Sequence, residues 1–120
     1  RVHSKDYNRR SQPGSYLHPA ESLPPLSVRT HAQARRILFE GKRAVGVEFD
    51  QGGTIRALRA GREVILSGGA INSPQLLELS GIGSPERLQA LGIPLVHALP
   101  GVGENLQDHF VVGLTYRLKR

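Results

Sequence analysis

The strongest constraint on the fold is a continuous apolar run that leads directly into two glycines. Residues 64–67 read VILS, and residues 68–83 continue as GGAINSPQLLELSGIG. A short run that is apolar at every position is typical of a strand buried on both faces of a parallel sheet. Because the two glycines permit a tight turn without side chains, the sequence predicts a buried strand, then a turn, then a helix.

The predicted helix carries its own start and stop signals. Ser73 is a favoured N-cap residue, and Pro74 suits the first helical position, where a missing N–H costs nothing. Gly81 or Gly83 then ends the helix, because glycine adopts the left-handed conformation common just past a helix end. These signals predict a helix that begins at Pro74.

A second short helix is predicted directly after the first. Ser84 is again a favoured N-cap, Pro85 takes the first helical position, and Glu86 suits the positive end of the helix. Gly92 closes the segment. Residues 93–109 then predict a short extended segment followed by a glycine-rich loop.

Alternating apolar residues upstream of residue 64 predict a small sheet. The strand-like segments are residues 26–30, 32–40, 43–50 and 54–60. Glycines at the sequences EGK and QGGT allow the positive φ angles that tight hairpin turns need. The last three segments therefore predict an antiparallel meander from Ala32 to Ala60.

The two ends of the chain have the character of a piece of a larger protein. Residues 1–25 are polar and rich in Pro and Ser, which predicts a loop or linker, and residues 110–118 alternate like a strand. The chain contains no methionine and opens on Arg1. We therefore expect further chain on either side of this segment.

Composition limits the classes of function. The chain has no cysteine, which excludes disulfides and zinc–thiolate sites. It has no apolar run long enough for a membrane span, and its first residues do not resemble a signal peptide. Of its 16 Lys and Arg residues, 12 lie in residues 1–62, which hold only 5 Asp and Glu. A basic half is compatible with a nucleic-acid partner, but the cations are scattered and few aromatic residues accompany them, which favours solvated strand faces.

Residue patterns alone leave the role of the Gly68-Gly69 turn open. The carboxyl end of a parallel strand, a glycine turn and a helix N-terminus together make a typical ligand site in α/β proteins. The same residues also suit a purely structural turn. The later sequence GVGENL, residues 101–106, has a leucine where a dinucleotide-binding fingerprint needs its third glycine, so we interpret it as a crossover loop.

Histidine chemistry receives little support. The five histidines are widely spaced, without metal-binding motifs. Asp108 and His109 are adjacent, but neighbours on a strand point to opposite faces, and no GxSxG nucleophile motif is present. A structural or supporting role for His109 is therefore favoured over a catalytic role.

Residues 69–83 resemble the second signature of the glucose–methanol–choline (GMC) family of flavin oxidoreductases, with its G-A-x-x-S-P, leucine pair and S-G-I-G. Two flanking stretches, residues 25–49 and residues 91–109 (which include LPGVGENLQDH), are also similar to that family. Within the family, the sequence is similar to the bacterial choline dehydrogenase-like branch. The resemblance implies an α/β fold, namely part of a doubly wound FAD-binding domain with an inserted antiparallel β-meander.

The resemblance also implies which residues approach FAD. Ala34 matches the position where the family contacts the adenine through its backbone, and many relatives have Val there. Close backbone approach to the cofactor is implied for Ser67, Gly68, Gly69 and Ala70. The family's diphosphate-binding GxGxxG and its C-terminal catalytic histidine are not in these 120 residues, so no catalytic residue is assigned.

The implied domains are a linker (1–25), the central part of the FAD-binding domain (26–109) and the first strand of a substrate-binding domain (110–120). The implied function is hydride transfer from the CH–OH group of an alcohol, choline or similar, to the flavin. Expected partners are that alcohol and the remainder of the same polypeptide, with no nucleic acid, in the cytoplasm or at the periphery of the inner membrane. A non-catalytic remnant serving as an interaction module and a basic nucleic-acid binder are the alternative classes.

Overall fold

The computed structural model describes Leu17, Ala20 and residues 26–116. The chain divides into two units, Arg1–Ala32 and Gln33–Arg120. The linker expected over residues 1–25 lies outside the described residues, apart from Leu17 and Ala20. The strand expected at residues 26–30 is wrong: this segment is irregular, and Leu26 and Val28 are exposed. A short alternating segment forms a strand only when a neighbouring strand pairs with its backbone groups.

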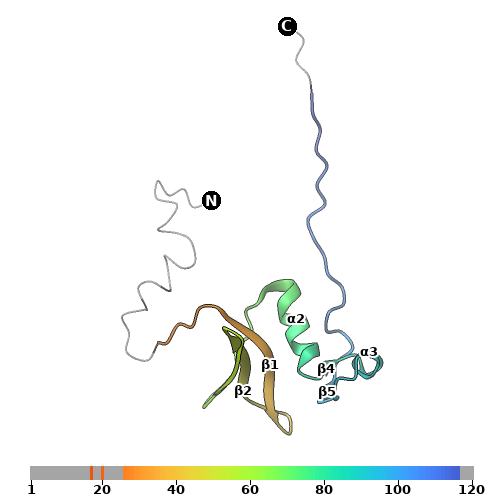
Figure 1. The fold of residues 1–120 in the computed structure, drawn as a ribbon. Helices are drawn as coiled ribbons and strands as arrows, with labels where there is room; N and C mark the ends of the chain where they lie inside the picture. Colours follow the sequence, from red (N-terminus) through yellow and green to blue (C-terminus); the bar gives the residue numbers. More distant parts are fainter. Residues whose placement is uncertain (1–16, 18–19, 21–25, 117–120) are drawn as a thin grey trace. The chain divides into compact units, whose positions relative to one another are not determined.

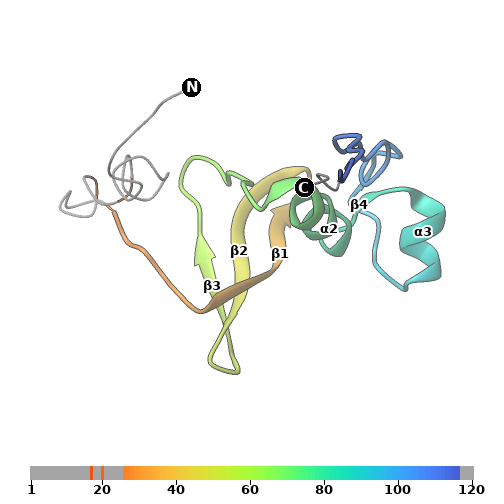
Figure 2. The same ribbon diagram turned by 90° about the horizontal axis from the view of Figure 1, so that it is seen from above.

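The antiparallel meander is present in the second unit. Its strands are β1 (Ala32–Glu40), β2 (Arg43–Gln51) and β3 (Thr54–Arg59), in the sheet order β1-β2-β3 (Figures 1 and 2). β2 and β3 pair antiparallel from Gly46 opposite Arg59 to Gln51 opposite Thr54. The turn glycines have the positive φ angles expected of them, and the Gly53 N–H donates to Asp50 Oδ1 at 2.8 Å. The local turn chemistry therefore sets the hairpins.

The segment before the first helix is not a strand. Residues 63–67 are irregular, and Ile65 is 75% exposed, so the expected buried strand is wrong in this chain. A strand of a parallel sheet needs at least one parallel neighbour to pair with its backbone groups, and the described residues offer it none. The apolar run is extended but unpaired.

The first helix, α2 (Gly69–Leu79), begins five residues before the expected start. Ser73 is not the N-cap; instead, its Oγ accepts the N–H of Gly68 at 3.0 Å. Pro74 lies inside the helix, where its missing N–H leaves one helical hydrogen bond unmade. The expected end is confirmed, because Ser80 is the C-cap and Gly81 follows with a φ of +86°.

The second helix, α3 (Pro85–Ala90), follows its predicted signals. Ser84 is the N-cap and its Oγ accepts the Arg87 N–H, Pro85 is the first helical residue, and Gly92 has a φ of +67°. Leu88 is fully buried on this helix. Local capping residues therefore define α3 as expected.

A short parallel pair of strands, which the sequence did not predict, brackets α3. β4 (Ile82–Gly83) pairs with β5 (His97–Ala98). Gly81 O accepts the backbone N–H groups of Val96 at 2.8 Å and of His97 at 3.1 Å. The pair returns the chain to the C-terminal end of α2, from which the glycine-rich loop then departs.

The segment after the glycine-rich loop is extended and unpaired. Residues 104–116 form no strand, and the described part of the expected strand (110–116) exposes Phe110 by 94% and Tyr116 by 81% (Figure 1, blue). The strand prediction is wrong for these residues because none of the described strands pairs with them. Residues 117–118 of that prediction lie outside the described residues.

Candidate functional site

The turn that leads into α2 has the exposure and geometry of a close-approach site. Ser67, Gly68, Gly69 and Ala70 are all exposed. Gly69 has a φ of +85°, and a Cβ built on it would meet no atom within 4 Å. The positive φ explains why glycine is needed there, and the open space leaves the main chain accessible to a ligand.

The helix start beside this turn has no side-chain cap. The N-cap residue of α2 is Gly68, which has no side chain to accept the first N–H groups of the helix. The first N–H groups of any helix have no partner within the helix, and they favour anionic or polar oxygens. The expected residues Ser67–Ala70 therefore form one continuous bend with exposed main chain.

Ala70 also lines a cleft of about 530 Å³. Its other lining residues come from α2, from α3 and from the glycine-rich loop: Ile71, Pro74, Gln75, Glu78, Arg87, Gly103, Glu104 and Leu106. The structure thus brings the GVGENL loop, interpreted from sequence only as a crossover, to the same cleft as the predicted bend.

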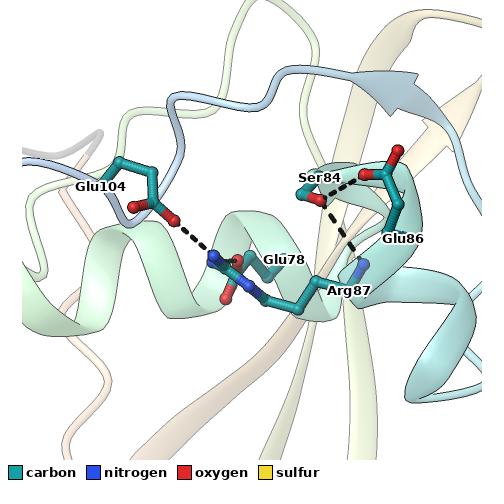
Figure 3. A network of polar contacts seen from close by, with 5 residues as sticks. All are labelled: Glu78, Ser84, Glu86, Arg87 and Glu104. Carbon is teal, nitrogen blue, oxygen red and sulfur yellow. Dashed lines mark hydrogen bonds and ion pairs between the residues drawn. The ribbon is translucent and has the colours of Figure 1, made fainter.

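An ion-pair network connects the residues on the side of this cleft that the glycine-rich loop forms. Arg87 Nη1 donates to Glu78 Oε1 at 2.6 Å, and Arg87 Nη2 donates to Glu104 Oε1 (Figure 3). Hydrogen bonds and attraction from Glu104 and Glu78 raise the pKa of the Arg87 guanidinium above its ordinary value. One side chain of α3 thereby links α2 to the glycine-rich loop. Sequence reasoning missed this network, because the three residues are far apart in sequence and form no motif.

Glu86, which is also drawn in Figure 3, lies in the first turn of α3. Ser84 Oγ donates to Glu86 Oε2 at 2.8 Å. Hydrogen bonds from the Glu86 backbone N–H and from the Ser84 hydroxyl lower the pKa of the Glu86 carboxyl. This local arrangement stabilises the helix start.

Ala34, the remaining expected site residue, is distant from the bend in the sequence and belongs to a different element. It is half-buried on strand β1. Three residues later on that strand, the Ile37 N–H donates to Ser80 Oγ at 2.8 Å, which joins β1 to the C-terminal end of α2. Sequence reasoning missed Ser80, although a serine that ends an apolar helix was an available signal.

Metal and histidine chemistry remain unsupported within the part of the chain that the structure describes. No group of three His, Cys, Asp or Glu side chains there is placed to hold a metal ion. The carboxylate of Asp108 accepts the backbone N–H of His109 at 2.7 Å. Asp108 is therefore engaged by the main chain of its neighbour.

The helix lengths bear on membrane insertion. Among the described residues, none of the helices has the length and apolar character to cross a bilayer.

An exposed glycine bend, a helix start and a bordering cleft are together typical of ligand-binding segments of α/β domains. The family model described as GMC oxidoreductase matches residues 1–111. The chain belongs to the GMC oxidoreductase family. The family resemblance of residues 69–83 and of their flanks is thereby confirmed.

Curated relatives agree with this assignment. The chain is 51% identical over 112 residues to oxygen-dependent choline dehydrogenase 1 of Chromohalobacter salexigens, covering 93% of this chain and 20% of that protein. It is 52% identical over 113 residues to an oxygen-dependent choline dehydrogenase of Escherichia coli, covering 92% and 20%. The chain thus spans about a fifth of the length of the curated relatives it matches.

Solved structures confirm the expected fold class. An FAD-dependent oxidoreductase from Chaetomium thermophilum matches with a TM-score of 0.73 and 39% identity, over 76% of this chain and 16% of that one. Pyridoxine 4-oxidase from Mesorbium loti matches with a TM-score of 0.75 and 32% identity, over 81% and 19%. The fold is that of an α/β segment of these oxidoreductases, with its antiparallel meander.

Proposed function

We propose that this chain is the central part of an FAD-dependent oxidoreductase that takes hydride from the CH–OH carbon of an alcohol. Choline or a similar primary alcohol is the proposed substrate, because the chain is about half identical to choline dehydrogenases over nearly its whole length. The observation that carries the proposal is the exposed bend at Gly69, which has open space above its main chain and lies next to the cleft-lining Ala70.

The residues of the bend fit a role in holding FAD. When bound, FAD supplies the electron acceptor for the hydride. The main chain of Ser67, Gly68, Gly69 and Ala70 approaches the cofactor without side chains in the way, and the unpartnered N–H groups at the start of α2 orient its polar oxygens. Ala34 contacts the adenine through its backbone, so alanine in place of valine leaves that contact available.

The proposed domain organisation follows the same reasoning. Residues 26–109 form the central part of the FAD-binding domain, residues 1–25 a linker, and residues 110–120 the first strand of a substrate-binding domain. The exposed apolar side chains of residues 110–116 support this last assignment, because a strand that faces a second domain needs an apolar face.

The remaining polypeptide is the proposed partner that completes the site. Its contribution includes the diphosphate-binding loop and the catalytic histidine that these 120 residues lack. We propose a cytoplasmic protein, with peripheral association at the inner membrane as the alternative. Nucleic acid is not a proposed partner, since Arg36 and Arg59 on the sheet are paired with carboxylates.

Gly69→Ala in the full-length protein tests the bend. The added methyl group enters the open space above residue 69 and strains a φ of +85°, so we expect the purified variant to retain less than about a tenth of the FAD per protein measured by flavin absorbance.

Gly53→Ala is the matched control for that test. Gly53 has a φ of +80° and equally open surroundings, but it lies in the β2–β3 turn of the meander. The strain is therefore similar, and the control should keep its full FAD content. Equal FAD loss in both variants would contradict the proposed bend site, and a wild-type protein without flavin would instead favour a non-catalytic module.

A further inference from the structure

Ser80 forms a buried hydrogen-bond junction between β1 and α2. Only 7% of Ser80 is exposed. Its Oγ accepts the Ile37 N–H at 2.8 Å, and its hydroxyl proton is donated to Leu76 O at 2.5 Å within α2. The Ser80 hydroxyl therefore donates one hydrogen bond and accepts another.

The sheet provides no acceptor for the Ile37 N–H of β1. β1 is an edge strand in the order β1-β2-β3, and an edge strand has backbone groups without a strand partner. Ile37 is 6% exposed, so its N–H is shielded from water. Removing the Ser80 hydroxyl would leave this buried N–H unpaired, which is costly.

β1 and α2 meet at Ser80, and each of them carries a proposed FAD contact. Each contact lies away from Ser80 along its element. α2 and β1 descend side by side in Figure 1, with their N-terminal ends at the top of the view, and they remain neighbours in Figure 2. From Ile37 back to Ala34 the strand covers about 10 Å. From Ser80 back to Gly69 the helix covers about 16 Å. A rotation of about 5° at the junction would move the far end of such a helix by about 1.4 Å.

The side chains around Ser80 pack loosely, so the angle between β1 and α2 depends on the hydrogen bond from Ile37 to Ser80. A cleft of about 510 Å³ separates the meander from the end of α2 and the segment after α3, and Ile37, Leu79, Ser80 and Val96 are among its lining residues. Because an open cleft provides fewer van der Waals contacts than a filled interface, side-chain packing alone constrains the angle between β1 and α2 weakly.

We propose that Ser80 is a positioning residue for FAD, which sets the distance between the adenine contact at Ala34 and the main-chain bend at residues 67–70. This inference rests on the proposed function. A ligand that spans both contacts, such as FAD, depends on the junction. A ligand that reaches only the adenine contact, such as free adenine, does not.

The test measures FAD and adenine binding to the deflavinated full-length protein, with FAD followed by flavin fluorescence and adenine as a competitor. Ser80→Ala should raise the Kd for FAD about tenfold, through one buried hydrogen bond and the displaced contacts. The Kd for adenine should stay within about twofold of the wild-type value, because adenine has no ribose or phosphate to reach the bend and makes only one of the two contacts.

Ser84→Ala is the matched control. It also removes a hydroxyl that accepts a backbone N–H, but at the start of α3, so it should lower the thermal midpoint while leaving both Kd values unchanged. If Ser80→Ala yields no folded protein, Ser80→Cys replaces it. The thiol is a weaker hydrogen-bonding group, and a rise of about threefold in the Kd for FAD is then expected.

The outcomes separate this inference from the proposed function. A Ser80 variant that binds FAD as the Ser84 variant does, or that loses adenine affinity as much as FAD affinity, overturns the positioning role alone. A wild-type protein that binds no FAD overturns the proposed function, and the positioning role with it.

Discussion

Gly81→Ala should be among the most damaging alanine substitutions in this chain. A Cβ at Gly81 would lie 2.3 Å from the backbone oxygen of Pro94 and 2.9 Å from Val96 Cγ2, at a φ of +86°. Left-handed backbone costs an alanine about 1–2 kcal/mol. The steric overlap is with main chain, which cannot rotate away, so the segment at Pro94 must move.

That movement disrupts the β4–β5 pair. Gly81 O accepts the N–H groups of Val96 and His97, and each such hydrogen bond contributes about 1 kcal/mol net. Together with the backbone strain, the expected loss in the free energy of unfolding is about 3–4 kcal/mol. This lies at the high end of single-substitution effects.

The assay is urea unfolding of the full-length protein, with the transition that releases flavin analysed by linear extrapolation. Gly92→Ala is the control. Gly92 has a φ of +67°, but a Cβ there would meet nothing within 4 Å, so only the strain of about 1–2 kcal/mol applies. If Gly81→Ala proves no more destabilising than Gly92→Ala, the steric argument is refuted.

Two further predictions concern the charged residues of Figure 3. The folded protein lowers the pKa of Glu86 below its ordinary value of 4.5, so its charged form contributes stability that is complete above about pH 4.5 and is lost as the pH falls through the lowered folded pKa. Unfolding measured from pH 6 down to about pH 3 should therefore show a shallower pH dependence for Glu86→Gln than for the wild type, and parallel curves would contradict the assignment. Arg87→Gln removes both ion pairs of an exposed guanidinium, so it should lower the thermal midpoint more at low salt than in about 1 M KCl. An equal loss at both salt concentrations would argue against an electrostatic origin.

The elements predicted correctly are those whose signals are local. Ser84, Pro85 and Gly92 define α3 within nine residues of chain, and the hairpin glycines define the meander turns. Such signals act through backbone φ angles and caps. They need no distant partner, so the sequence alone contains them.

The start of α2 shows where a local signal misleads. Ser73 and Pro74 match a helix start, yet the helix begins at Gly69 and the Ser73 hydroxyl turns back to the Gly68 N–H. A serine hydroxyl accepts from several nearby backbone groups, and a proline in the second turn removes only one hydrogen bond. Sequence does not distinguish these two uses of the same pair of residues.

The candidate site was predictable only where it is continuous in sequence. The bend at residues 67–70 follows from four consecutive residues and one family signature. The connections made by Ser80 to Ile37, and by Arg87 to Glu78 and Glu104, span 43, 9 and 17 residues. They depend on tertiary placement, which no spacing rule specifies.

Two of the three wrong strand predictions share one physical cause. Residues 63–67 and 110–116 are apolar and extended, and they remain unpaired and largely exposed. An apolar strand gains stability from backbone pairing and from burial of its side chains, and neither is available from the strands that the structure describes. Relatives about five times as long have ample further chain to supply both. Residues 63–67 lead directly into the bend at Gly69, so we expect their pairing with further strands to fix the end of the bend that Ser80 does not reach.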